Sequence, residues 1–372
     1  MNDSPTTVAE QSAVQSPGTA QEKSAAQASG AAPVKNTAQD KDAAQAVNAL
    51  PTVSASPHIR SHDTTVSIML DVIIAMLPAA IASALIFGYR ALIVTAVSTV
   101  SCVLFEYISR KVMKRPNTIG DLSAVVTGLL LAFNLPSSIP VWMIPIGAFF
   151  AVVVAKQFFG GIGQNFVNPA LIGRIVLMVS FPTAMSSWVT ASGWNSADAV
   201  SAATPLAVLN GTVSGALPVS LSDLFFGKTG GCLGETCALA LLLGLIYLLA
   251  RRVISPAIPC VYIGTTALCM LIAGGGDYHF MLSQVLSGGL LLGAIFMATD
   301  YTTSPITLKG KIIYAVGCGL LTAVIRLYGS LPEGVSFSII IMNILTPLID
   351  RYTKPVPFGF VKEKKGKEAK AQ

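Results

Sequence analysis

Ten apolar stretches, most of them close to the length of a bilayer, constrain what this chain can fold into. They cover residues 66–87, 91–108, 122–135, 139–158, 166–186, 235–250, 254–273, 279–299, 310–328 and 335–350. A helix needs about 20 apolar residues to cross the hydrocarbon core of a membrane. Only 11% of the residues are charged, whereas a soluble domain carries roughly 25%. We therefore predict an all-α integral membrane protein with about ten transmembrane helices.

Composition divides the chain into five consecutive parts. Residues 1–55 are rich in Ala, Gln, Ser and Thr and contain no aromatic residue, so we expect a disordered, cytoplasmic N-terminal tail. Two groups of five apolar stretches follow, at 56–186 and 235–350. A more polar segment at 187–234 separates them, and a basic tail at 351–372 ends the chain.

The positive charges indicate how the predicted helices are oriented. Lys and Arg gather after the second and sixth stretches, between the eighth and ninth, and in the C-terminal tail (Arg110, Lys111, Lys114, Arg115, Arg251, Arg252, Lys309, Lys311, Arg351 and Lys354). Cytoplasmic loops carry an excess of these residues. With an even number of spans both termini are predicted to be cytoplasmic, which places segment 187–234 outside. The net charge of +6 therefore follows from the cytoplasmic loops and tail and does not indicate nucleic-acid binding.

A sequence repeat supports a division into two halves. Residues 122–131, in the third stretch, resemble residues 282–291, in the eighth. In the predicted topology these two stretches run in opposite directions. The sequence therefore predicts two inverted five-helix repeats, an arrangement found in many transporters.

The segment 198–206 consists mostly of small residues, several of them polar, and lies between the two groups of apolar stretches. Ser/Ala/Thr loops before a proline are common, so composition alone carries little weight here. The pattern, however, resembles the signature at which a separate transferase joins the phosphate of FMN to a threonine hydroxyl in membrane flavoproteins. The matching residues are Asp198, Ser201, Ala203 and Thr204, with Ala202 where a glycine is usual.

Residues 160–170 contain three glycines and two asparagines, Asn165 and Asn168, at the entrance to the fifth stretch. In a helix, residues three apart share a face, and amides within a membrane need hydrogen-bond partners. A heteroaromatic ligand with imide and carbonyl groups would satisfy them. Close helix packing at the glycines is the alternative, and both interpretations remain open at this point.

Several ionisable residues fall inside or at the ends of the apolar stretches: Asp71, Glu106, Asp121, Arg174, Asp300 and Arg326. Charged groups at membrane depth are costly and mark an ion pathway or an ion pair. We expect Asp71 and Asp300 to belong to an ion pathway. A structural pair between an aspartate and an arginine, or a side chain that reaches the membrane interface, is the alternative for each.

The cysteines predict no metal site within this chain. Four of the six lie in apolar stretches, where a thiol is usually a small apolar group. No Cys-x-x-Cys pair or Cys/His cluster is typical of zinc or iron–sulfur binding. Cys232 and Cys237 lie five positions apart in sequence. The sequence is compatible with a disulfide between them and with two free thiols.

Together these features resemble the NqrB/RnfD family of membrane proteins. The resemblance covers about residues 56–360. It rests on segments 56–60, 127–136, 160–174, 198–206 and 298–305. The chain is more similar to the Rnf branch, because the longer N-terminal segment usual in the NqrB branch is not found.

The resemblance implies an electron-carrying subunit of a redox-driven ion pump, with no complete reaction and no catalytic residues of its own. It implies FMN bound covalently to Thr204 and riboflavin bound non-covalently near Asn165 and Asn168. Electron transfer through these flavins would drive Na+ or H+ translocation across the bacterial or archaeal cell (inner) membrane.

The implied partners are other membrane and peripheral subunits that carry iron–sulfur clusters and the NAD site, a flavin transferase, and membrane lipids. Two alternatives remain open. One is the B subunit of a Na+-translocating NADH:quinone reductase, and the other is a solute channel or secondary transporter with the same inverted repeats. A covalent flavin would discriminate against the channel or transporter.

Overall fold

The computed structural model describes residues 63–189, 204–209, 220–329 and 334–355. Within these ranges the chain is helical and forms no β-strand, apart from one isolated bridge between Pro136 and Cys232. The predicted N-terminal tail, most of the C-terminal tail and three residues of the flavin signature, Asp198, Ser201 and Ala203, lie outside them.

The helices follow the apolar stretches in order. The first half contains α2 (Thr65–Phe87), α3 (Tyr89–Val112), α4 (Ser123–Phe133), α5 (Met143–Phe149) with its π-helical continuation η2 (Phe150–Gln157), and α6 (Pro169–Ser180). The second half contains α10 (Ala238–Ala250), α11 (Ala257–Ala273), α12 (Tyr278–Leu286), α13 (Leu290–Leu292) with its π-helical continuation η3 (Gly293–Met297), α14 (Leu308–Tyr328) and α15 (Val335–Thr353). Three short helices lie between the halves in sequence: α7 (Pro182–Met185), α8 (Pro205–Leu209) and α9 (Leu221–Phe226).

The lengths of these helices confirm an all-α membrane protein. Four of them, α2, α3, α14 and α15, are long and apolar enough to cross a membrane, and α12 with α13–η3 makes a fifth that is bent by 62°. Five shorter apolar helices of 10–17 residues coincide with the remaining predicted stretches. The number of ten crossings stays a prediction, because the short helices do not reach the roughly 20 residues of a full span.

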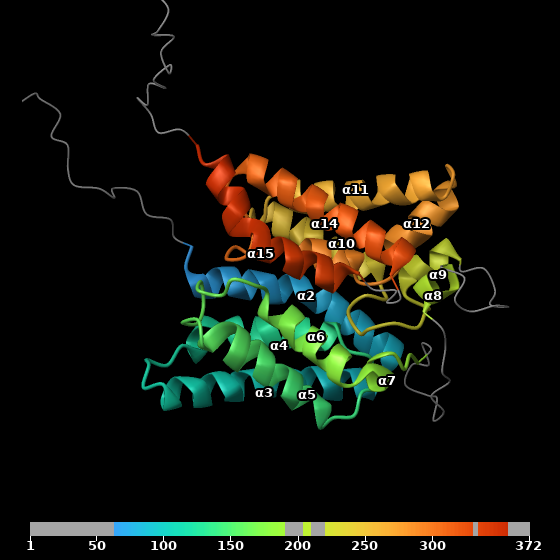
Figure 1. Ribbon diagram of the computed structural model, residues 1–372. Coiled ribbons are helices and arrows are strands. Elements are labelled where there is room, and N and C mark those ends of the chain that lie inside the picture. The colour runs from blue at the N-terminus through green and yellow to red at the C-terminus, as the bar shows by residue number, and fades with distance from the viewer. Residues whose placement is uncertain (1–62, 190–203, 210–219, 330–333, 356–372) are drawn as a thin grey trace, which may run out of the picture. The chain divides into compact units, whose positions relative to one another are not determined.

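The two halves form two groups of packed helices. Helix α3 packs against α4 and α5, whereas α11 packs against α14 and α12. Figure 1 shows α3 and α5 on one side of the bundle and α11 and α14 on the other, with α2 and α10 between them. The contact between α2 and α10 is the most extensive that joins the two halves.

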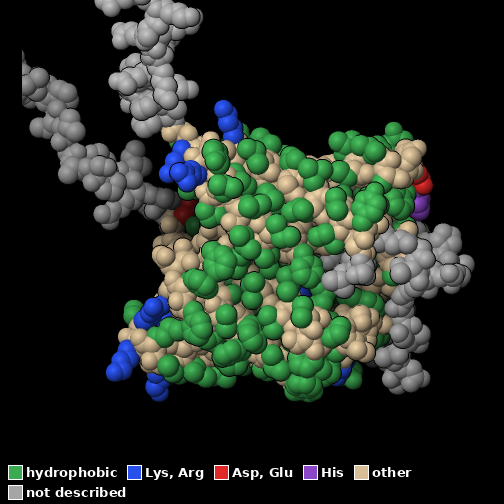
Figure 2. Space-filling view, viewed as in Figure 1, with side chains coloured by type: hydrophobic (Ala, Val, Ile, Leu, Met, Phe, Trp, Pro, Cys, Tyr) green, Lys and Arg blue, Asp and Glu red, His purple; other side chains and the backbone are tan. Residues whose placement is uncertain are grey.

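One end of the bundle is strongly basic. Helix α2 begins and α15 ends at this end, and α7, α8 and α9 lie at the opposite end (Figure 1). Figure 2 shows most of the visible Lys and Arg side chains at this end, at the left edge of the view, beside a wide apolar surface. They come from the ends of α3, α10 and α15 and the first turn of α14. We call this the basic end.

The first helices of the two halves run in opposite directions. Asp71, near the start of α2, contacts Arg251, which directly follows α10. Inverted repeats require this relation. The matched stretches 122–131 and 282–291 nevertheless differ in conformation. The first lies largely in α4, but the second crosses the break between α12 and α13, where Gly288 has a φ of 67° that favours glycine.

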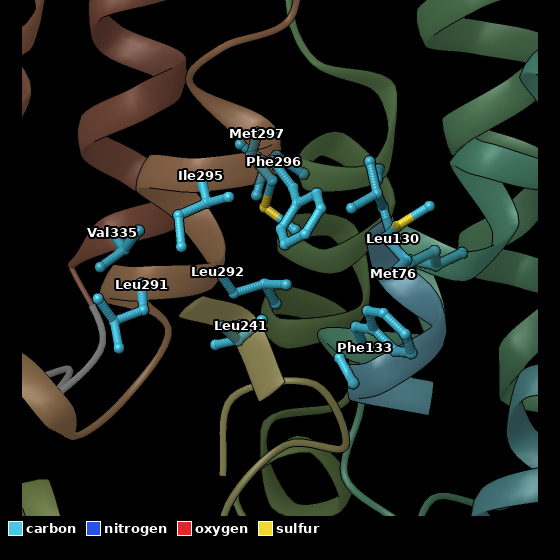
Figure 3. Close-up of a cluster of buried hydrophobic side chains, with 14 of the residues drawn as sticks. Met76, Leu130, Phe133, Leu241, Leu291, Leu292, Ile295, Phe296, Met297 and Val335 are labelled. Carbon is cyan, nitrogen blue, oxygen red and sulfur yellow. The ribbon is translucent and has the colours of Figure 1, made fainter. Parts of the chain in front are cut away.

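The interior lies where the two halves meet. Figure 3 shows Phe296 of η3 and Leu292 of α13 on the side of Met76 of α2, Leu130 of α4 and Leu241 of α10. All residues of α13 and η3 are buried. Within a membrane such close packing, rather than exclusion of water, holds helices together. The second π-helical segment is therefore fixed in the middle of the fold.

Candidate functional site

A cavity of about 290 Å³ lies between the two halves. Ligand sites commonly have volumes of roughly 300–1,000 Å³. Most of its walls are apolar side chains, among them Ile68, Val72, Val126, Leu130, Leu248 and Phe296. Its lining also includes the exposed residues Thr65, Gly163 and Tyr301. The cavity therefore reaches the surface near the start of α2, at the basic end.

The two predicted asparagines both line this cavity, but they do not share a helical face. Helix α6 begins at Pro169, so Asn165 lies in the preceding loop and Asn168 is the N-cap. The prediction of a shared face is wrong because proline favours the first position of a helix, which makes the residue before it a cap.

Both amides are held by protein groups. The side-chain oxygen of Asn168 accepts the Ala170 N–H at 3.0 Å, and its nitrogen donates to the Met297 carbonyl at 3.3 Å. The nitrogen of Asn165 donates to the Val167 carbonyl at 3.1 Å. Each amide nitrogen carries two hydrogens and each oxygen accepts two bonds. The amides are thus fixed in the cavity wall and keep capacity for a further partner.

Asp300 completes the polar end of the cavity from the second half. The Thr302 hydroxyl lies 3.1 Å from both the Asn165 amide oxygen and an Asp300 carboxylate oxygen. The Asn165 nitrogen lies 3.5 Å from the same carboxylate oxygen. Burial raises the pKa of Asp300, and hydrogen bonds from Thr302, Asn165 and Thr303 oppose that rise in pKa. Residues 135 positions apart in sequence therefore meet at one site.

Lys156 is a charged residue of this cavity that sequence reasoning missed. It lies on η2 and is only 3% exposed. Its ammonium donates to Glu106 at 2.8 Å and to Ser123 at 2.6 Å. The available signal was a lysine inside the apolar stretch 139–158, two positions before its end, where a lysine usually reaches the membrane interface.

Asp71 lies on another surface, in the contact between α2 and α10. Its carboxylate accepts from the Tyr247 hydroxyl at 2.8 Å and from the Arg251 guanidinium at 3.2 Å. The Asp71 side chain is 12% exposed and the Arg251 side chain 54%. Asp71 is not among the residues that line the cavity. The structure thus brings Asp300 to the asparagines and leaves Asp71 in an ion pair.

Thr204 lies far from the cavity, at the end of the bundle where α8 is found (Figure 1). It is 6% exposed, and its hydroxyl accepts the Ala207 N–H at 3.2 Å, so it caps α8. The adjacent cleft measures about 10 Å³, enough for roughly one water molecule. The described residues hold the hydroxyl, but this cleft does not fit a flavin ring, which would need space outside it.

Glu235 is a second ionisable residue that sequence reasoning missed, and it lines the cleft beside Thr204. It lies in a buried turn whose Leu233 and Gly234 N–H groups donate to the carbonyls of Leu135 and Phe133, both at 3.0 Å. One Glu235 oxygen accepts the Cys232 N–H at 2.9 Å. Cys232 and Cys237 are free thiols, so the disulfide that the sequence left open is not formed.

Comparisons with known proteins agree with one another. The family described as NQR2, RnfD, RnfE matches residues 52–359. The chain is 50% identical over 322 residues to the D subunit of the Na+-translocating ferredoxin:NAD+ oxidoreductase complex of Acetobacterium woodii, covering 86% of this chain and 98% of the relative.

Two further relatives extend the range of similarity. The chain is 44% identical over 323 residues to the D subunit of the proton-translocating ferredoxin:NAD+ oxidoreductase complex of Clostridium ljungdahlii, covering 83% of this chain and 96% of the relative. It is 34% identical over 344 residues to the D subunit of the ion-translocating oxidoreductase complex of Escherichia coli, covering 82% of this chain and 98% of the relative.

Proposed function

The chain belongs to the NQR2, RnfD, RnfE family, and on that premise we propose that it is the membrane flavoprotein subunit of an Rnf-type ion-translocating ferredoxin:NAD oxidoreductase. Other membrane and peripheral subunits of that complex supply the iron–sulfur clusters and the NAD site. The translocated ion is Na+ or H+, since the names of the Acetobacterium woodii and Clostridium ljungdahlii relatives differ in this respect.

The cavity at the basic end is the observation that carries this proposal. A flat heteroaromatic ring needs apolar walls and a few fixed polar groups at its edge. Val72 and Phe296 belong to such walls, and the Asn165 and Asn168 amides are fixed at the polar end. Residues of both halves line the cavity. We assign it to the second, non-covalent flavin, riboflavin.

The roles of the chain's own residues in this site follow from their chemistry. The amides of Asn165 and Asn168 orient the polar edge of the ring, each hydrogen bond contributing about 1 kcal/mol net. The apolar walls exclude water from it. A flavin supplies one- and two-electron transfer, and the partner subunits supply its donor and acceptor.

The covalent FMN is assigned to Thr204. Its hydroxyl lies at the end of the bundle opposite the basic end (Figure 1). If the basic end is cytoplasmic, as the Lys and Arg distribution favours, Thr204 lies on the external side. Because Thr204 is only 6% exposed and caps α8, attachment requires that α8 be displaced or that FMN be joined before this segment packs.

The decisive experiment fills the cavity. The complex is purified from a host that expresses the flavin transferase, and flavin released by denaturation is measured against flavin that stays on the chain. Val72→Trp, in the cavity wall, should remove released riboflavin and leave covalent FMN. Leu77→Trp, on the same helix but 46% exposed, is the matched control and should retain both. Equal riboflavin in both variants would contradict the assignment.

The attachment site is tested on the same preparations. Thr204→Val keeps the shape of the side chain and removes the oxygen that a phosphoester needs. It should abolish the fluorescent band on denaturing gels and the FMN mass on the intact chain, while released riboflavin remains. Covalent FMN on the Thr204→Val protein would place the attachment elsewhere.

A further inference from the structure

Lys156 is a buried cation whose position is fixed by two other helices. Its ammonium donates to Glu106 of α3 at 2.8 Å and to Ser123 of α4 at 2.6 Å. Lys156 and Glu106 side chains are 3% and 1% exposed. A buried charge is retained only when it is paired and hydrogen-bonded. The carboxylate of Glu106 supplies that pairing for Lys156.

Both acceptors of Lys156 are themselves held from the loop before α4. The Thr118 hydroxyl donates to the second Glu106 oxygen at 2.9 Å, and the Ser123 hydroxyl donates to Asp121 at 2.6 Å. Such a network leaves the ammonium little freedom to reorient. A charge fixed in advance interacts with a ligand without the cost of reorganisation.

One N–H of the Lys156 ammonium has no acceptor in the described part of the chain. An ammonium group has three N–H bonds, and acceptors in the described part of the chain account for two of them. Lys156 and Ser123 both line the 290 Å³ cavity. The third N–H is therefore available to an acceptor inside the cavity. Lys156 lies on a π-helical segment, a conformation found frequently at functional sites.

We propose that Lys156 donates a hydrogen bond to the flavin in this cavity and raises its reduction potential. The inference rests on the proposed function, because it requires a flavin there. Each electron that the partner subunits' iron–sulfur donor passes to the ring adds one negative charge when no proton follows it, and no covalent bond in the protein forms or breaks. A fixed ammonium nearby favours the more negative form. Glu106 is a positioning residue.

Potentiometric titration of the non-covalent flavin in the assembled complex tests this, with covalent FMN as the internal reference. Replacing Lys156 alone would leave Glu106 buried without its partner, so the test variant is Lys156→Met with Glu106→Gln. We expect its reduced form to be favoured about tenfold less, a shift of about 59 mV to more negative potential for a one-electron couple. Lys111→Met, which removes an exposed charge of α3, is the control and should not shift it.

Lys156→Arg is the second variant, because it keeps a cation opposite Glu106. The larger guanidinium should enter the space of the ring and lower riboflavin affinity about tenfold. An unchanged potential in the double variant that retains riboflavin would overturn the proposal. If the variant with Lys156→Met and Glu106→Gln does not assemble, unchanged riboflavin affinity in Lys156→Arg would overturn the proposal. Absence of riboflavin from the unmodified complex would instead contradict the proposed function itself.

Discussion

At the scale of single residues, the partners of Asp71 in α2 distinguish an ion pair from an ion pathway. Asp71 is bound by the Tyr247 hydroxyl and by the Arg251 guanidinium, both from the region of α10. This set of partners corresponds to the structural pair that the sequence left open for an acid in an apolar stretch. Because α2 and α10 form the main contact between the halves, the pair links the two halves at the basic end.

We therefore expect Asp71→Asn to lower the yield of assembled complex while the number of ions moved per electron stays unchanged. Arg251→Met should have a similar effect, and the double variant should be no worse than either single one, because both changes break the same pair. Ion transport and electron transfer are measured on the same proteoliposomes. A selective loss of ion transport in Asp71→Asn would instead show that Asp71 belongs to the ion pathway.

Some residues of the cavity could be predicted from the sequence, and others could not. Asn165 and Asn168 were found because amides in a membrane are conspicuous, although their places as loop and cap residues were not foreseen. The meeting of Asp300 with Asn165 depends on packing between the halves. Lys156 was missed because a lysine near the end of an apolar stretch is expected to reach the interface, whereas Glu106 and Ser123 hold it inside.

At the scale of elements, Gly128 sets how closely α4 approaches α3. A Cβ atom at this position would lie 2.6 Å from the Thr99 Cα. The Ser98 hydroxyl donates to the Gly128 carbonyl at 2.8 Å, which holds the two helices at this short distance. Small residues commonly allow such approaches between helices in membranes.

Gly128→Val should therefore force α3 and α4 apart and lower stability by about 1–3 kcal/mol, the usual effect of overpacking. Because α4 also lines the cavity through Val126 and Leu130, riboflavin content should fall with it. Thermal unfolding of the detergent-solubilised complex measures the stability. Gly264→Ala is the control, since a Cβ there meets nothing within 4 Å. Equal melting temperatures for the two variants would refute this account of the contact.

The ten apolar stretches predicted helix positions well, because apolar runs of this length have few other uses. Their interruptions were harder to place. The third predicted stretch, residues 122–135, extends only two residues beyond the observed end of α4 at Phe133. The break after α12 depends on the left-handed backbone at Gly288. The π-helical segments η2 and η3 have no sequence signal that we recognise. Both pack closely against other helices, η2 against α3 and α6 and η3 against α11 and α15.

At the scale of the whole molecule, the two proposed flavins belong to opposite ends of the bundle. The cavity reaches the surface at the basic end, whereas Thr204 caps α8 at the other end (Figure 1). Electrons that pass between the two sites must therefore cross much of the membrane thickness. The side of the membrane that each flavin faces depends on the orientation of the bundle. The distribution of Lys and Arg indicates that orientation.

Thiol labelling tests that orientation directly. Lys354 follows α15 at the basic end, and Lys228 lies between α9 and α10; both are exposed. Each is replaced by cysteine in a background where the exposed Cys260 is alanine. Because Lys and Arg are enriched on the cytoplasmic side, a membrane-impermeant reagent should modify Lys228→Cys in intact spheroplasts and Lys354→Cys only after permeabilisation. The opposite pattern would place the basic end outside, and with it the cavity assigned to riboflavin, leaving Thr204 on the cytoplasmic side.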